Sequence, residues 1–430
     1  MKQSLIKTIL KHPLIHTLTG LRGNPRACVY TEPMWGLSVG LCAPYASVFM
    51  LALGIEDERI GLISSIYMLS QVVFAFLSGV ITDKLGRRKA TPVFDFLAWS
   101  VPCLIWAFAQ NFWFFLVAAL LNGMMMVPTN SWDCLLVEDA DKSQITHIYS
   151  WVIICGHLSA FFAPISSVLV SKLTLIPAVR ILYVNAFIVM TLKIFILYKC
   201  STETQTGLQR MKETRGKSIT SQLGGYDRVL RIMSRSGGMK FAVAVTAIVG
   251  IARMVGGTFW PIIVSQKLEV PDRILPLFPM IRSFIALVFF FTIIARINQL
   301  RLKNPLLIGF TSYLASQVFL LLAPTGGWVS YAVLVLSLLF EGFGTAILAT
   351  LAESLVAIHA DTNERARMMA ILHLIVMLIS APFGWIGGLL SGVSRDLPFI
   401  LIISLLAAGF MIVLVFYSKT KPVGDDVTKM

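Results

Sequence analysis

Charged residues are scarce in this sequence. Only 13% of its 430 residues are Asp, Glu, Lys or Arg, whereas 57% are hydrophobic, and the mean hydropathy is +0.79. A water-soluble domain could not keep that much apolar surface away from solvent. The composition therefore excludes a soluble globular protein and predicts one that is embedded in a membrane.

Motifs of enzymes, metal sites and disulfide scaffolds are also lacking. The sequence contains no H-E-x-x-H, no Walker glycine loop, no G-x-S-x-G and no clustered zinc ligands. Its six cysteines are scattered singly, without C-x-x-C spacing. We therefore expect no enzymatic activity, no metal site and no cofactor.

Long apolar runs are what the sequence does contain. A run of about 20 residues can cross the hydrocarbon core of a bilayer as a helix. Such runs predict an all-α membrane protein with twelve transmembrane helices in two six-helix halves. They cover residues 34–54, 60–81, 91–109, 112–137, 145–173 and 177–198, and then 241–264, 274–294, 306–323, 329–358, 368–390 and 399–416.

The chain divides at one long polar stretch. We expect a cytoplasmic amino-terminal segment (1–33), a first half (34–200), a cytoplasmic linker (201–238), a second half (239–418) and a cytoplasmic tail (419–430). The linker is rich in bases, and "YDRVLRIMSR" within it predicts a short amphipathic helix. Bases beside a membrane are ordinary, so we expect contact with the lipid bilayer and no nucleic-acid partner.

The distribution of bases predicts the orientation. With twelve crossings, one side receives nearly all Lys and Arg of the loops, including the linker and both ends of the chain. The positive-inside rule then places both termini in the cytoplasm of a cell-membrane protein.

An internal repeat relates the two halves. "LLNG" at 120–123 leads through Asp133 to Asp141, and "LFEG" at 339–342 leads through Glu353 to Asp361 at the same interval. Each segment is followed by a helix with a proline near its middle, Pro164 or Pro382. Two related halves are typical of transporters.

The stretch "GVITDKLGRRKA" at 79–90 completes the pattern. A Gly, an Asp, a base, a Gly and a basic cluster between the second and third helices resemble the signature of the major facilitator superfamily, across nearly the whole chain. The resemblance implies a secondary transporter that works by alternating access. It also implies a conformational latch, here formed by Gly79, Asp83, Gly86, Arg87 and Arg88.

The latch has a physical rationale and a simpler alternative. Gly86 permits a tight turn, because it has no Cβ to forbid a positive φ. Asp83 is expected to face the start of the eleventh helix near Arg365 and Arg367, where exposed N–H groups favour an anion. Alternatively, the bases of the loop only fix it on the cytoplasmic side.

A cytoplasmic charge network is expected beside the latch. Asp133 and Glu353 occupy equivalent repeat positions, and they predict ion pairs with Arg301, Arg365 or the bases of the loop. A proton relay or contact with the substrate is the alternative.

Charges inside the bilayer are costly and therefore mark candidate proton or substrate sites, unless they lie close enough to a helix end to reach the membrane interface, as we expect for Lys193. Four stand out in the sequence: Glu341, Arg253, Arg282 and Asp95. Glu341 is the strongest candidate for the coupled proton, because its repeat counterpart is the neutral Asn122. Arg253 is its expected partner, and a permanent Arg253–Glu341 pair that only fixes packing is the alternative.

These observations favour proton-coupled export of a small organic or amphipathic compound, with protons and the substrate as partners and the protein as a monomer. The fifth helix, "GHLSAFFAPISS", departs from the efflux signature, so the direction of transport stays open. Two alternatives remain, which are proton-coupled uptake of an anionic nutrient and a membrane sensor or scaffold that transports nothing.

Overall fold

The computed structural model describes residues 13–218, 226–292, 302–359 and 365–417, and these residues are helical apart from short turns. The chain divides into two compact units. Unit 1 comprises residues 1–43 and 73–222, and unit 2 comprises residues 44–72 and 223–430. Helix α5 (Asp57–Leu85) contributes its first part to unit 2 and its last part to unit 1.

Unit 1 contains long helices that are interrupted by single short turns. A π-helical or 3₁₀ turn joins α6 to α7, α8 to α9 and α10 to α11, so each pair forms one span. Its helices are α2 (Pro13–Gly20), α3 (Gly23–Cys42), α6 (Arg87–Asp95), α7 (Val101–Ala107), α8 (Phe112–Asn122), α9 (Met126–Val137), α10 (Ile145–Ser159), α11 (Ala163–Leu173), α12 (Leu175–Cys200) and α13 (Gln205–Glu213).

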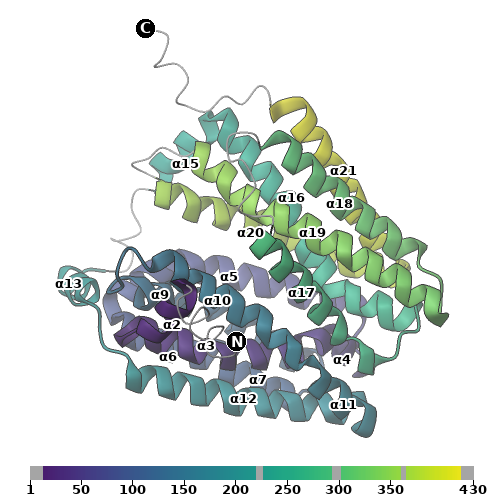
Figure 1. Ribbon diagram of the computed structural model, residues 1–430, viewed down its shortest axis with the longest axis horizontal. Helices are drawn as coiled ribbons and strands as arrows, with labels where there is room; N and C mark the ends of the chain where they lie inside the picture. The colour runs from purple at the N-terminus through teal and green to yellow at the C-terminus, as the bar shows by residue number, and fades with distance from the viewer. Residues whose placement is uncertain (1–12, 219–225, 293–301, 360–364, 418–430) are drawn as a thin grey trace, which may run out of the picture. The chain divides into compact units, whose positions relative to one another are not determined.

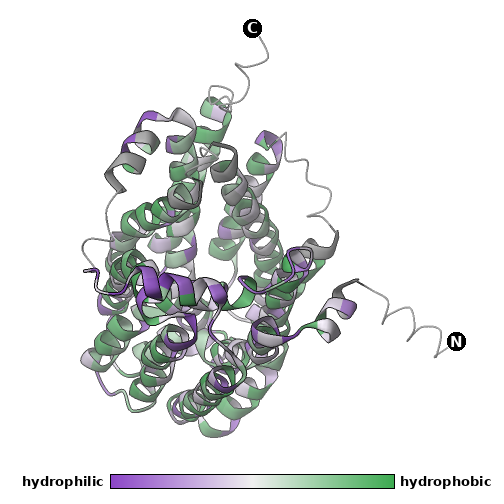
Figure 2. Cartoon of the chain, turned by 90° about the vertical axis from the view of Figure 1, so that its left-hand side faces the viewer, coloured by the Kyte–Doolittle hydropathy of each residue, from purple (hydrophilic) through white to green (hydrophobic). Residues whose placement is uncertain are grey.

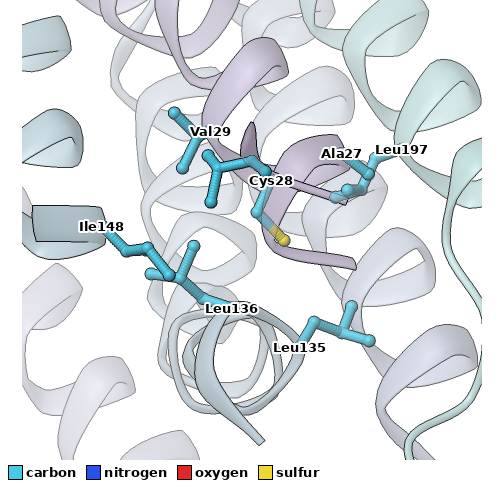
Figure 3. Close-up of a cluster of buried hydrophobic side chains, with 8 residues drawn as sticks. Ala27, Cys28, Val29, Leu135, Leu136, Ile148 and Leu197 are labelled. Atoms are coloured by element: carbon cyan, nitrogen blue, oxygen red, sulfur yellow. The ribbon is translucent and has the colours of Figure 1, made fainter. Parts of the chain in front are cut away.

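The core of unit 1 lies where α3 meets α9, α10 and α12. Figure 3 shows Cys28 of α3 among apolar side chains from the other three helices, including Leu136, Ile148 and Leu197. All of these side chains are almost fully buried. Close packing at this point fixes α3 in the unit, together with the charged side chains that it carries.

Unit 2 holds the helices of the second half, together with α4 and the first part of α5. Helix α18 packs along α19 and α21 (Figure 1), and Gly344 of α19 lies so close to Tyr313 of α18 that a Cβ would approach its backbone nitrogen to 2.6 Å. Its helices are α4 (Ala46–Ala52), α15 (Tyr226–Arg235), α16 (Gly237–Ile262), α17 (Leu277–Thr292), α18 (Lys303–Leu322), α19 (Gly327–His359), α20 (Arg365–Val393) and α21 (Leu397–Phe416).

The expected transmembrane pattern is present. Among the described residues, 11 helices are long and apolar enough to cross a membrane. The expected helix at 274–294 corresponds to α17, of which 16 residues are described. Figure 2 shows hydrophobic residues along most of the helical ribbon. The predicted amphipathic helix of the linker is α15.

The first helix begins earlier than its apolar run. We expected it from residue 34, but α3 starts at Gly23 and includes the polar residues Asn24 and Glu32. Asn24 lies within hydrogen-bond distance of two partners, because its amide donates to Asp139 Oδ2 at 3.3 Å and its oxygen accepts from the Thr202 N–H at 2.8 Å. These partners compensate for the burial of a polar residue in the first turns of the helix.

Candidate functional sites

The signature loop is a tight turn between α5 and α6. Gly86 has φ of 80°, a left-handed conformation that favours glycine. A Cβ at this position would also lie 2.4 Å from Glu203 Oε2, so both the backbone angle and the space require glycine. The sequence predicted the tight turn at Gly86 but not that Glu203 lies beside it.

Glu203 caps the helix that follows the turn. Its two carboxylate oxygens accept hydrogen bonds from the backbone N–H groups of Arg87 and Arg88, at 2.9 and 3.0 Å. Exposed N–H groups and the helix dipole both favour an anion at a helix N-terminus. The start of the linker is therefore bound to the signature loop.

Arg87 connects three elements of unit 1. Its side chain is only 5% exposed, and it pairs with Asp83 at 3.0 Å and with Glu138, at the end of α9, at 3.1 Å. Thr204 of the linker donates a hydrogen bond to Glu138. Sequence reasoning missed both acids, although Glu138 directly follows the predicted helix 112–137 and Glu203 lies at the start of the expected linker.

The latch itself stays a prediction. The expected partners of Asp83 are Arg365 and Arg367, whose side chains lie outside the described residues. The same is true of Glu353 and Arg301 in the expected charge network. Asp133 forms no ion pair within the described part of the chain, and the acid that pairs with Arg87 is Glu138 instead.

Three charged side chains meet inside unit 1. Lys193 of α12 donates to Asp95 of α6 at 3.1 Å, and their side chains are only 5% and 7% exposed. Glu32 of α3 is also buried, and Lys193 and Asp95 are among its electrostatic neighbours. We expected Lys193 to extend toward a membrane interface, which was wrong, because its side chain turns inward to an acid that the sequence places on another helix.

Unit 2 holds the strongest proton candidate. Glu341, near the middle of α19, pairs with Arg282 of α17 at 2.8 Å. The expected partner, Arg253, does not take this position in the described residues. The pair retains some access to solvent, with 16% of the Glu341 side chain and 29% of the Arg282 side chain exposed.

An aromatic ring completes this site. The guanidinium of Arg282 stacks over Trp260 of α16 at 4.5 Å from the ring centroid, a favourable cation–π distance. Arg282 Nε and Trp260 Nε1 are both buried, and neither has a hydrogen-bond partner within the described part of the chain. Sequence reasoning did not find this stacking, because it depends on contacts between helices.

Arg253 lies apart from the Glu341–Arg282 pair. It sits near the middle of the 31-residue span Gly237–Lys267, is exposed, and forms no ion pair with any described residue. Instead it lines a cavity of about 160 Å³ between α16, α19 and α20, together with His373. The four predicted intramembrane charges thus occupy different settings, with Asp95 in unit 1 and the other three in unit 2.

The first part of α5 packs on the last part of α20 through small residues. A Cβ at Gly61 would lie 2.2 Å from the Gly384 oxygen, and one at Gly388 would lie 2.6 Å from the Asp57 oxygen. Asp57 pairs with Arg395 and accepts a hydrogen bond from Ser391 at 2.9 Å. This contact, which we call the α5–α20 contact, lies at the opposite end of α5 from the signature loop and was not predicted.

The helical membrane fold and the signature loop together are those of a membrane transporter. The family model of the Major Facilitator Superfamily matches residues 35–335, and the chain belongs to this family. It is thus a multi-pass membrane protein and a secondary transporter of a family that binds small-molecule substrates and is not enzymatic.

Similarities to individual proteins are more distant. A stretch of 95 residues is 28% identical to the quinolone resistance protein NorA of Staphylococcus aureus, and it covers 21% of this chain and 24% of NorA. The chain thus spans about a quarter of the length of this relative.

Solved structures match over almost the whole chain. The nucleoside transporter NupG, as a D323A mutant, has a TM-score of 0.70 at 14% identity, with 93% of this chain and 100% of that one covered. The human organic anion transporter MFSD10 has a TM-score of 0.61 at 17% identity, with 94% and 100% covered. At such identities these structures show the fold alone.

Proposed function

We propose that this transporter exports a small organic or amphipathic compound in exchange for protons, and that Glu341 carries the coupled proton. The observation that carries the proposal is the Glu341–Arg282 pair, a partly exposed carboxylate and guanidinium on two helices within the membrane-embedded part of unit 2. Intramembrane ionisable residues are rare unless they serve transport.

A breakable ion pair suits a coupling site. While Arg282 lies against Glu341, the two opposite charges compensate one another. When substrate or a conformational change separates the two, the carboxyl loses its counter-charge and takes up a proton. Arg282 keeps a second contact, its stacking on Trp260, which can hold the guanidinium during that step.

Export is the favoured direction because 95 residues resemble a quinolone resistance protein. Uptake of an anionic nutrient is the second candidate. It is favoured by Arg253, an intramembrane cation that has no ion pair in the described residues. A sensor or scaffold is less consistent with the intact signature sequence at 79–90, since a protein that transports nothing has no need of Asp83 in that loop.

Purified protein in liposomes distinguishes these functions. A library of small organic compounds is screened for accumulation with the pH gradient imposed in either direction. Proton exchange predicts accumulation when the vesicle lumen is the acidic side, because protons leave as the compound enters. Accumulation only when the outer solution is acidic indicates cotransport, which supports uptake. No pH-dependent accumulation of any compound contradicts both transport proposals.

We also propose the orientation that the bases predict, with both termini in the cytoplasm. In that orientation the signature loop and the Glu203 contact lie on the cytoplasmic side, and the α5–α20 contact lies on the opposite side.

A further inference from the structure

Among the described charged side chains near Tyr313 in unit 2, positive charge exceeds negative charge. Tyr313, which is almost fully buried, has Glu341, Arg282 and Arg253 as its charged electrostatic neighbours. Glu341 and Arg282 neutralise one another through their ion pair. The charge of Arg253 is left over within the described part of the chain.

Arg253 cannot escape to the membrane surface. It lies near the middle of its span, and half the thickness of a hydrocarbon core is about 15 Å, which exceeds the length of an arginine side chain. An unpaired cation at this depth is costly unless it faces water or an anion. The cavity that Arg253 lines supplies the space for either.

The size and lining of the cavity fit an anionic group. Its volume is about 160 Å³. Liquid water occupies about 30 Å³ per molecule, so the cavity can hold a carboxylate or a phosphate but not a whole drug-sized compound, which needs roughly 300 Å³ or more. The remaining wall is mostly apolar, with Val249, Ala349 and Leu372 among its residues, so a bound anion would find its main donors on Arg253.

His373 provides a second polar group. Its Nδ1 lies 2.8 Å from the Met369 carbonyl oxygen, and because a carbonyl only accepts, Nδ1 donates this hydrogen bond. Nε2 of the neutral ring is then an acceptor, so it can accept a hydrogen bond from a hydroxyl of a bound compound, while the donors to an anion come from Arg253. Thr246 adds no donor, since its hydroxyl proton already goes to the Ala242 oxygen at 2.7 Å.

We propose that the cavity lined by Arg253 and His373 binds the carboxylate or phosphate of a small anionic compound. The guanidinium is a planar fork of donors that matches either group in a bidentate geometry. The inference rests on the proposed function only in treating the bound group as part of the transported compound. It places the anion-binding subsite away from Glu341. Arg253 can then hold one end of the compound while the proton is exchanged at Glu341.

Equilibrium binding tests the proposal without transport. The full chain is placed in phosphatidylcholine nanodiscs, and binding of radiolabelled benzoate and of inorganic phosphate is measured by dialysis. We expect saturable binding of at least one probe. Arg253→Gln should weaken it at least tenfold, and Arg253→Lys should weaken it less, because the charge remains but the fork is lost.

Two further variants separate a local effect from misfolding. Ala349→Leu keeps Arg253 but fills the cavity, and it should also weaken binding. Arg180→Gln removes an arginine of unit 1 that donates to the Ala109 oxygen at 3.0 Å, and it should leave binding unchanged. Binding is measured without a gradient and without transport, so failure of the proposed function and failure of this inference are distinguishable.

A second arm identifies the source of the anion. Nanodiscs that also contain phosphatidylglycerol are compared, and the retained lipid is measured by native mass spectrometry. Lipid retention that is lost in Arg253→Gln, with no binding of the free probes, assigns the site to a lipid headgroup. The proposal is overturned if neither the probes nor the lipid bind, or if Arg253→Gln binds within twofold of the unmodified protein.

Discussion

The buried charges of unit 1 predict an unequal response to two substitutions of one ion pair. Lys193 faces both Asp95 and Glu32, whereas each acid depends on Lys193 for its nearest positive charge. Lys193→Met therefore leaves two buried acids without a counter-charge. Asp95→Asn leaves Lys193 with Glu32 as a remaining partner.

The expected magnitudes follow from burial. Both members of the pair are at most 7% exposed, so the value for a surface pair does not apply. Removing one partner of a buried pair costs about 3–5 kcal/mol, and we expect Lys193→Met to fall in this range. For Asp95→Asn we expect about 1–3 kcal/mol, because a neutral amide keeps the shape and part of the hydrogen bonding.

The assay is unfolding of the purified protein by sodium dodecyl sulfate in mixed micelles, followed by tryptophan fluorescence. Lys199→Met is the matched control, because Lys199 lies on the same helix but is exposed and near its end, and it should change the free energy of unfolding by less than about 0.5 kcal/mol. Adding Asp95→Leu to Lys193→Met should recover much of the loss, since an apolar pair can replace a buried ion pair. The reasoning is refuted if Lys193→Met costs no more than Lys199→Met, or less than Asp95→Asn.

Three further predictions concern conformational change and orientation. Asp83→Asn should leave the protein in the membrane but lower its transport rate, since a loss of about 1.4 kcal/mol in one conformation shifts a two-state ratio tenfold; an unchanged rate in liposomes would reject the latch. Gly388→Leu should also slow transport, because the added Cβ would lie 2.6 Å from the Asp57 oxygen. Gly392→Leu should not, because a Cβ there would meet no atom within 4 Å. Equal rates in the two variants would show that the α5–α20 contact is dispensable. In a background without native cysteines, Asn111→Cys should react with an impermeant thiol reagent added to intact cells and Arg215→Cys should not, and the reverse pattern would contradict the proposed orientation.

The fold was readable from the sequence because the bilayer leaves few choices. A long apolar run must form a helix to satisfy its backbone, so counting runs located nearly every span. The start of α3 was missed because it does not depend on hydropathy. The apolar run begins at residue 34, whereas the helix begins at Gly23, where Asn24 is stabilised by Asp139 and Thr202 from distant parts of the chain.

The site was only partly predictable. The depth of a residue in the membrane follows from its position along an apolar run, but the direction of its side chain does not. The sequence placed Glu341 and Arg282 within the membrane, yet their pairing depends on how α17 and α19 face one another. The same limit explains Lys193, whose position near a helix end suggested an interface although its side chain is buried. Glu203 was missed because a capping acid from the linker follows no repeat or periodicity.

The signature loop shows the reverse case, in which a local rule was sufficient. A glycine followed by a basic helix start predicted a tight turn, and Gly86 adopts the left-handed conformation that such a turn requires. Glu203, whose carboxylate lies against Gly86, belongs to the linker and could not be found by such a local rule.

A comparison of two acid variants in liposomes tests whether Glu341 carries the coupled proton. Once a substrate is identified, Glu341→Gln is assayed in liposomes for gradient-driven accumulation and for exchange of labelled against unlabelled substrate without a gradient, with the distant acid variant Glu269→Gln as the control. A neutral mimic of the protonated carboxyl cannot exchange a proton but need not stop the conformational cycle, so Glu341→Gln should lose accumulation and keep exchange, while Glu269→Gln should keep both. Gradient-driven accumulation with unchanged proton stoichiometry in Glu341→Gln would contradict the account.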